Sequence, residues 1–332
     1  MLRKKSHEQQ WLETLENRFS LSSEEQQQLA ILKKEYQGEL YLDQLFEVFS
    51  TKETFHLDDL TLKHQQSIIQ IDKLFLVGKT IYLLDAKNYQ GSYALKEGKW
   101  YRNEDKLEKN ILQQLQRAQT ILEKIIKEQG VDFTVEAALV FTNKDCQLSV
   151  NQVLEEEIVC ESEIPSWLRG KFVGGVWDKK RKNATLLLNA VHSYIVPSFK
   201  TNRTLEIEKM NRLRPGICCE KCHHFHTRLL RHKIICLHCG HQESKKKAYT
   251  RTICDFDTIF HQEELTIGKL RLFFGKDLSE EYLRKILKKH FIRTGKKSKK
   301  ASYVNFGVIF AYWFAGKIDY FKQTERRIFW KD

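Results

Sequence analysis

Two apolar runs, at residues 67–77 and 80–86, are separated only by Gly78-Lys79, and this arrangement constrains the fold more than any other feature of the sequence. A two-residue loop with Gly in its first central position is typical of a type II′ β-hairpin. Side chains alternate between the two sides of a strand, so a nearly continuous apolar run places apolar side chains on both faces of this hairpin. We therefore expect a hairpin that other elements cover on both faces.

The same hairpin carries charged residues at its open end. Pairing outward from the turn puts Asp72 opposite Asp85. Alternation adds Gln70 and Lys87 to the same face. Facing carboxylates on apolar strands, with Cβ atoms about 4.5–5.5 Å apart, repel each other and are poorly solvated. A divalent cation such as Mg²⁺ would relieve that repulsion and also bind phosphate oxygens. The residues alone leave two interpretations open, a metal site or an Asp–Lys–Asp ion-pair cluster.

The segments around the hairpin alternate between helical and extended patterns. Residues 24–49 have apolar positions at helical spacing, and residues 104–129 combine helix-forming composition with an apolar stripe. A further strand pair is predicted across Glu97-Gly98, and residues 135–142 form a short β-rich run. This order of helix, strands, helix and strand predicts a mixed α/β or α+β domain.

The spacing of the hairpin residues resembles a nuclease signature. Asp72 is followed after twelve residues by Asp85-Ala86-Lys87, which resembles the PD-(D/E)xK pattern with Asp in the place where Glu is more common. The surrounding sequence is more similar still to the nuclease-related domain called NERD, and this resemblance covers approximately residues 33–145. The segments that carry it are Gly38-Glu39, Gln70-Ile71-Asp72, Asp85-Ala86-Lys87-Asn88, Gly91 and Phe141-Thr142-Asn143.

The resemblance implies a restriction-endonuclease-like mixed sheet flanked by helices, and it implies roles for five residues. Asp72 and Asp85 would bind Mg²⁺ or Mn²⁺, and Lys87 would have a catalytic role. Glu39 would be a supporting or metal-proximal carboxylate, with an exposed helix carboxylate as the alternative. Gln70 would line the site.

One departure from the family lies near the second long helix. Relatives often have Asn-Pro followed by Gln, whereas here Asn110 is followed by Ile111, with Gln113 and Gln114 beyond. The resemblance therefore does not assign these glutamines to the site. This departure does not affect the assignment of the three core residues of the hairpin.

Four of the eight cysteines form two CxxC pairs in the second half of the chain. Thirteen residues separate the pairs, and each pair offers two thiolates to a tetrahedral structural Zn²⁺. Nearby histidines allow a substituted ligand, and a redox or accidental pairing is the alternative. Cys146, Cys160 and Cys254 fit buried apolar positions better than ligand positions. We predict a zinc ribbon with the ligands Cys219, Cys222, Cys236 and Cys239.

The net charge of +13 is concentrated in the C-terminal part of the chain. Residues 1–200 hold 27 Lys/Arg and 29 Asp/Glu, whereas residues 201–332 hold 29 and 14. So basic a region indicates a nucleic-acid partner or a solvated basic face. A short helix at 265–275, a second from Ser279 and a basic hairpin at 292–303 follow the order of a winged helix-turn-helix, with a packed helical pair as the alternative. The predicted nucleic-acid contacts are Arg284, Lys285, Lys288, Lys289, Arg293, Lys296, Lys297, Lys299 and Lys300.

The sequence shows no pattern of export or membrane insertion. Residues 1–10 are polar, and the apolar run at 304–315 is shorter than the roughly 20 residues of a membrane span. We expect a cytosolic protein with reduced or metal-bound cysteines and no membrane partner.

Together these features predict a metal-dependent nuclease that acts on nucleic acid, with DNA the favoured substrate. The rivals are a non-catalytic nucleic-acid-binding protein on a nuclease-like scaffold and a regulator that contacts protein partners. The predicted organisation is a helical extension at 1–32, a nuclease-like domain at 33–150, its remainder and a linker at 151–211, a zinc ribbon at 212–245 and a mainly helical, basic DNA-binding region at 250–332.

Overall fold

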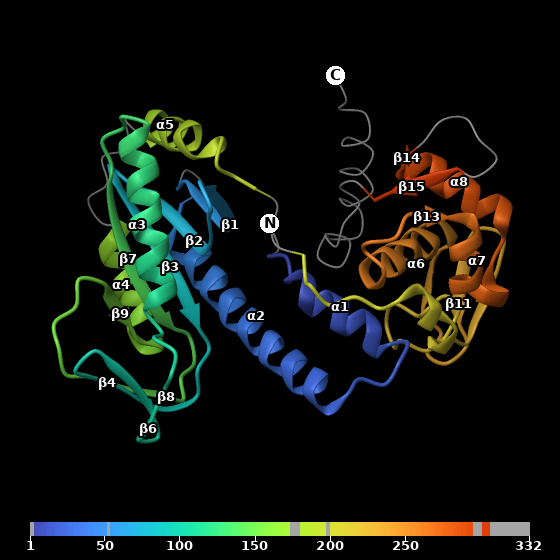
Figure 1. Ribbon diagram of the computed structural model, residues 1–332, viewed down its shortest axis with the longest axis horizontal. Helices are drawn as coiled ribbons and strands as arrows, with labels where there is room; N and C mark the ends of the chain where they lie inside the picture. The colour runs from blue at the N-terminus through green and yellow to red at the C-terminus, as the bar shows by residue number, and fades with distance from the viewer. Residues whose placement is uncertain (1–2, 52–53, 173–179, 197–199, 295–300, 306–332) are drawn as a thin grey trace. The chain divides into compact units, whose positions relative to one another are not determined.

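The structure, a computed structural model, divides into two compact units (Figure 1). The central unit is Ile31–Ser198. The terminal unit combines Met1–Ala30 with Phe199–Asp332. None of the described helices combines the length and apolar character that crossing a membrane requires. The structure describes residues 3–51, 54–172, 180–196, 200–294 and 301–305.

The strands of the central unit make two sheets. They are β1 His56–His64, β2 Ser67–Val77, β3 Thr80–Lys87, β4 Gly91–Lys96, β5 Lys99–Arg102, β6 Asp105–Lys106, β7 Thr134–Phe141, β8 Cys146–Val150 and β9 Glu157–Val159. The larger sheet has the order β1-β2-β3-β7-β9 and the smaller one the order β6-β5-β4-β8. In the larger sheet β1, β2 and β3 pair antiparallel, whereas β3, β7 and β9 pair parallel. The central unit is therefore a mixed α+β fold, as predicted.

Helices cover both faces of the larger sheet, as the sequence predicts. They are α2 Ser23–Phe49, of which the part from Ile31 belongs to the central unit, α3 Gln113–Glu128, α4 Ile164–Phe172 and α5 Lys180–His192. On one face α3 and α5 pack against Leu74 and Leu83. On the other face α2 and α4 pack against Phe75 and Leu84 (Figure 1). Adjacent residues of one hairpin thus point into two separate cores, which fixes the hairpin between two helical layers.

The predicted hairpin is confirmed as β2 and β3. Its strands pair from Val77 opposite Thr80 outward to Lys73 opposite Leu84. Gly78 has a φ of 60°, a left-handed value that glycine adopts without strain, whereas Lys79 does not have a positive φ. This combination fits the predicted type II′ turn.

The helix expected at 104–129 is shorter than predicted and begins only at Gln113. The residues before it extend the smaller sheet, where Tyr101 pairs with Lys106. The side chain of Asn110 then closes a turn by accepting a hydrogen bond at 3.0 Å from the backbone N–H two residues on. Strand pairing and this turn override the helix-forming composition of the segment.

The terminal unit combines helices with two small antiparallel sheets. Its elements are α1 His7–Glu16, β10 Thr227–Leu229, β11 Lys233–Cys236, β12 Gln242–Ser244, α6 Lys245–Ile259, β13 Leu265–Thr266, α7 Ile267–Phe274, α8 Glu280–His290, β14 Ile292–Thr294 and β15 Ser302–Val304. One sheet has the order β10-β11-β12 and the other the order β13-β15-β14. The two predicted helices correspond to α7, which ends at Gly275 with a φ of 55°, and α8. The predicted hairpin corresponds to β14 and β15.

Buried contacts join α1 to α6 within the terminal unit. The indole N–H of Trp11 donates a hydrogen bond to the carbonyl oxygen of Ile259 at 3.1 Å. Arg18, just after α1, forms a buried ion pair with Asp255 at 3.2 Å. Its guanidinium also lies 3.9 Å from the ring centroid of Phe273. The segment around α1 therefore shares a core with α6 and α7.

Candidate active site and metal centre

Asp72, Asp85 and Lys87 converge at the open end of the β2–β3 hairpin. The backbone ladder between the strands stops one residue before Asp72, so the expected Asp72–Asp85 pair is not part of it. Instead, Oδ2 of Asp72 accepts a hydrogen bond from the backbone N–H of Ala86 at 2.9 Å. Nζ of Lys87 donates to Oδ1 of Asp85 at 2.6 Å. The three side chains that the sequence singled out therefore form one cluster.

The chain has an unusual conformation beside this cluster. In the ladder between β1 and β2, Asp58 pairs with Lys73 and the residue after Asp59 pairs with β2 again, so the ladder skips Asp59. The φ of Asp59 is 51°, a left-handed value. This backbone region is uncommon for residues other than glycine, and Asp tolerates it better than most. Oδ1 of Asp59 accepts a hydrogen bond from the amide nitrogen of Gln70 at 2.8 Å. That contact fixes the orientation of the Gln70 amide next to Asp72.

Asp85 is the most constrained member of the cluster. The residue is buried at 5% exposure, and its Oδ2 atom has no hydrogen-bond partner among the described residues. Burial, together with the negative charge of Asp72, raises the pKa of Asp85 to about 7, although Lys87 opposes the shift. A buried carboxylate oxygen without a donor is costly, and a cation is the partner that such an oxygen fits.

Lys87 stays protonated in this setting. Burial lowers its pKa, but the charges of Asp85 and Asp72 outweigh burial, so the net shift is upward. The ammonium group therefore acts as a fixed positive charge and hydrogen-bond donor. The arrangement does not suit it to remove a proton from another group.

A small cavity lies between the hairpin and α3. Its volume of about 10 Å³ is enough for one water molecule or one cation. Asp72 and Asp85 line it together with Gln70, and Gln114 from the first turn of α3 completes its polar lining. The sequence left Gln114 unassigned, because only the packing of α3 on the sheet brings this side chain to the cavity. The cavity, the two carboxylates and the unpartnered Oδ2 atom together fit a small oxygen-seeking cation.

Glu39 lies outside this cavity lining, in α2 on the other face of the sheet. The preceding Gly38 explains how α2 comes close to the strand ends. A Cβ atom added to Gly38 would lie 2.5 Å from Oγ1 of Thr142 and 2.7 Å from Cβ of Asn88. Glu39 itself is half-buried. Its supporting role stays a prediction.

One comparison with known proteins bears on this half of the molecule. Residues 34–142 match the family model of the nuclease-related domain. The matched span runs from α2 to the end of β7 and contains the whole cluster of Asp72, Asp85 and Lys87. No curated protein and no solved structure matches the chain. The match supports a nuclease-related domain in the central unit and covers none of the C-terminal half.

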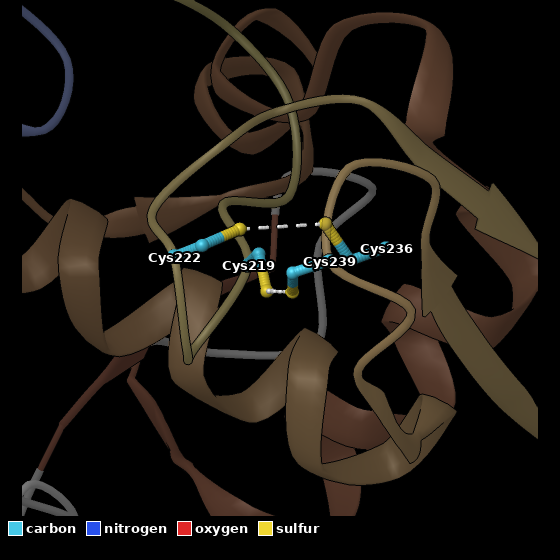
Figure 2. Close-up of side chains that lie close together, drawn as sticks. All are labelled: Cys219, Cys222, Cys236 and Cys239. Carbon is cyan, nitrogen blue, oxygen red and sulfur yellow. Dashed lines mark hydrogen bonds between the residues drawn. The ribbon is translucent and has the colours of Figure 1, made fainter.

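The four predicted zinc ligands meet in the terminal unit (Figure 2). Sγ of Cys219 lies 3.7 Å from Sγ of Cys239, and Sγ of Cys222 lies 3.6 Å from Sγ of Cys236. All four sulfur atoms lie within 4.8 Å of one another. A tetrahedral Zn²⁺ with Zn–S bonds of about 2.3 Å would hold its sulfurs about 3.8 Å apart. The cluster can therefore hold a metal ion such as zinc.

The two CxxC turns share one backbone geometry. In each turn the residue after the second cysteine has a left-handed φ, of 59° at His223 and 71° at Gly240. Its N–H donates to the carbonyl oxygen of the first cysteine, at 3.0 Å in one turn and 2.9 Å in the other. Equivalent turns of this kind present two thiolates each toward a shared centre.

The other cysteines lie outside this cluster. Cys254 is buried in α6, as expected, whereas Cys146 and Cys160 are half-buried. Burial raises the pKa of the Cys146 thiol to about 11, and the nearby Cys160 adds to the shift. A thiol with a raised pKa is a poor nucleophile at neutral pH.

The predicted basic residues of α8 lie on one exposed helix surface. Arg284 pairs with Glu280 at 2.5 Å, an exposed contact of small energetic weight. Leu283, Ile286 and Leu287 occupy the buried side of the same helix. Lys296, Lys297, Lys299 and Lys300 lie outside the described residues, as does 306–332, which includes most of the aromatic C-terminal segment. The exposed predicted contacts are Arg284, Lys285, Lys288, Lys289 and Arg293.

Proposed function

We propose that the central unit is a metal-dependent nuclease that hydrolyses phosphodiester bonds of nucleic acid, with DNA the favoured substrate. The observation that carries the proposal is the buried Oδ2 atom of Asp85, which lacks a hydrogen-bond partner among the described residues and belongs to a residue that lines a cation-sized cavity. The match of residues 34–142 to the nuclease-related domain supports the same chemistry.

In the proposed reaction each residue of the cluster has a separate task. Asp72 and Asp85 would hold Mg²⁺ or Mn²⁺ through their carboxylate oxygens. The bound cation would polarise the scissile phosphate and lower the pKa of the attacking water. Protonated Lys87 orients that water and offsets the negative charge that builds on phosphorus. Gln70, held by Asp59, lines the site beside Asp72, and we keep Glu39 as a supporting carboxylate.

The order of elements supports a restriction-endonuclease-like fold for this unit. A helix, three antiparallel strands, a crossover helix and a parallel fourth strand come in the order α2, β1 to β3, α3 and β7, with β4 to β6 between β3 and α3. The metal-binding carboxylates would then lie on adjacent central strands, with a helical layer on each face.

We further propose that the terminal unit binds nucleic acid through a winged helix-turn-helix beside a zinc ribbon. The order α6, β13, α7, α8, β14 and β15, with β15 in the middle of its sheet, supports the winged fold. The exposed cations of α8 would contact DNA, and the zinc site would be structural because four thiolates leave no coordination position open. A reducing, cytosolic setting suits the eight free cysteines.

The second candidate function is nucleic-acid binding without catalysis. The basic surface of α8 would be sufficient for a non-enzymatic nucleic-acid-binding protein that uses the central unit as a scaffold. A regulator that contacts protein partners would need neither phosphate affinity nor the Asp72–Asp85–Lys87 cluster. Retention of that cluster and the unpartnered Oδ2 atom favours the nuclease.

The test is a cleavage assay on purified full-length protein with plasmid, linear and single-stranded DNA and RNA in Mg²⁺ or Mn²⁺. We expect cleavage of at least one DNA substrate, and we expect Asp72→Ala to abolish it. Asp132→Ala is the matched control, because Asp132 belongs to the same unit and its side chain is 87% exposed. Equal cleavage by the wild type and by Asp72→Ala would remove the catalytic assignment.

A further inference from the structure

Tyr89 lies two residues beyond Lys87, between β3 and β4, and its ring is held in place from two sides. The ring stacks on Tyr93 with centroids 5.1 Å apart and an interplanar angle of 23°. It also makes an edge contact with Phe141 at 6.1 Å between centroids. Both partners belong to the hydrophobic core cluster into which α3 packs. Contacts with the hydrophobic core therefore fix the position of the Tyr89 side chain.

The phenol of Tyr89 interacts electrostatically with the charged cluster. Lys87 and Asp85 both lie within electrostatic reach of it, and so does Glu35 of α2. Tyr89 is half-buried, and its hydroxyl makes no hydrogen bond to any of the described residues. Burial raises the pKa of this phenol, so the group keeps its proton at neutral pH. It therefore offers an O–H donor beside the proposed metal site.

Arg102 supplies a positive charge next to Tyr93, the ring that stacks on Tyr89. In the β4–β5 ladder it lies directly opposite Tyr93, and its guanidinium carbon lies 5.8 Å from the centroid of that ring. Its side chain is exposed and forms no ion pair within the part of the chain that the structure describes. Arg102 is also within electrostatic reach of Tyr89. An arginine with its donors available beside an acidic cluster suits an anionic ligand.

We propose that Tyr89 and Arg102 form a second phosphate-binding site that holds the backbone phosphate adjacent to the scissile one. The inference rests on the proposed nuclease function, because Asp72, Asp85 and Lys87 define where the scissile phosphate lies. The phenol O–H and the guanidinium fork would each donate to non-bridging phosphate oxygens. Both residues are positioning residues in this role, since they fix the nucleotide next to the reacting bond without touching that bond.

A purely structural role for Tyr89 makes a different prediction. If the ring only fills space against Tyr93 and Phe141, Tyr89→Phe should leave ligand binding unchanged because the ring contacts remain. If the hydroxyl binds phosphate, the same substitution removes one hydrogen bond and keeps the packing. For Arg102, Arg102→Lys should retain part of the affinity, because lysine keeps the charge and loses the planar fork.

The experiment measures binding of thymidine 3′,5′-bisphosphate and thymidine 5′-monophosphate to the full chain in Mg²⁺ by calorimetry. The bisphosphate carries two adjacent backbone phosphates on one nucleoside and has no phosphodiester bond to cleave. We expect the wild type to bind the bisphosphate about tenfold tighter than the monophosphate. Tyr89→Phe should reduce this preference about threefold, and Arg102→Gln should reduce it about fivefold or more. Tyr101→Phe and Lys99→Gln, on the other side of β5, are the matched controls and should leave it unchanged.

The outcomes separate this inference from the proposed function. A wild-type preference below twofold, or one that Tyr89→Phe and Arg102→Gln leave intact, overturns the second phosphate site whether or not the protein cleaves DNA. A preference that both variants lose upholds the site even if no nucleic acid is cleaved, in which case only the catalytic proposal fails. Where cleavage is present, the variants should raise KM for a short oligonucleotide about fivefold with little change in kcat.

Discussion

Two lysines of the central unit lie beside carboxylates, and their surroundings give them different roles. Lys73 is 1% exposed, pairs with Asp43 at 2.9 Å and with Asp58, and lies 4.4 Å from the ring centroid of Phe46. Its charge is balanced by neighbours from α2 and β1, so it holds the helix to the sheet. Lys87, by contrast, lies beside two carboxylates that also line a cavity. One carboxylate oxygen there has no hydrogen-bond partner among the described residues.

Asp85 should make the stability of the metal-free protein depend on pH. Its pKa is raised to about 7 in the folded protein, whereas an unfolded aspartate titrates near 4. The folded state therefore binds more protons between these values, and stability falls as pH rises through this window. We expect the wild-type melting temperature, without added divalent cation, to drop more steeply from pH 5 to pH 8 than that of Asp85→Asn. Saturating Mg²⁺ should reduce the drop in the wild type alone, and parallel pH profiles for the two proteins would contradict the assignment.

Gly38 should tolerate no side chain. Alanine would place Cβ 2.5 Å from Oγ1 of Thr142 and 2.7 Å from Cβ of Asn88, so α2 would have to shift away from the strand ends. We expect Gly38→Ala to lower the free energy of unfolding by about 1–3 kcal/mol in urea titrations. Gly170→Ala in α4 is the matched control, because a Cβ there meets nothing within 4 Å. That control should be neutral or stabilising by up to about 1 kcal/mol, and equal behaviour of both variants would rule out the close approach.

The cysteine turns form one structural element with β10, β11, β12 and α6. Arg251 of α6 is 1% exposed, pairs with Glu243 of β12 and donates to the carbonyl oxygen of Cys218 at 2.7 Å. A change in the metal cluster should therefore alter the stability of α6 as well as that of the two turns.

Metal analysis of the purified protein should find about one zinc per chain. Cys219→Ser with Cys236→Ser should lose that zinc and lower the melting temperature of the terminal unit, because metal binding and folding are linked in small ribbons. Cys146→Ser is the matched control, since Cys146 lies in the central unit and outside the cluster. Full zinc retention in the double variant would show that other residues bind it.

The elements that the sequence predicted best are those whose signals are local. The turn and alternation of the β2–β3 hairpin lie within one short stretch, and the same holds for α2, α7 and α8. β1 was missed because its acidic residues at Asp58-Asp59 interrupt the apolar pattern, and its burial depends on pairing with β2. The site was predicted in outline for the same reason. Gln114, Tyr89 and Arg102 were not, because helix packing and ladder register bring them to the hairpin.

The order of the chain has one consequence that the sequence did not reveal. The chain begins in the terminal unit, passes through the central unit and returns to the terminal unit near residue 199. Helix α1 therefore folds with α6, and removing only the C-terminal half would strip the cover from Trp11, Leu12 and Leu15. Fragments for experiments should follow the two units rather than a single cut.

The basic surface of α8 should dominate the salt dependence of nucleic-acid binding. A fragment of residues 31–198 lacks this surface, so its affinity for duplex DNA should fall much less steeply with salt than that of the full chain. Each lost phosphate contact lowers the slope of log K against log salt by about 0.9. Replacing Lys285, Lys288 and Lys289 with Gln in the full chain should therefore lower the slope by about 2–3, as measured by fluorescence anisotropy. An unchanged slope would place the binding surface elsewhere.

The proposal that the central unit is a metal-dependent nuclease is tested most directly by the rate of plasmid cleavage during a Mg²⁺ titration. The wild type should cleave in proportion to metal occupancy, and Asp132→Ala should do the same. Asp85→Ala should be slower by at least about 100-fold at every Mg²⁺ concentration, because it removes a carboxylate that we propose as a cation ligand. Wild-type protein that fails to cleave at any Mg²⁺ concentration, or an Asp85→Ala variant that cleaves at the wild-type rate, would contradict the proposal.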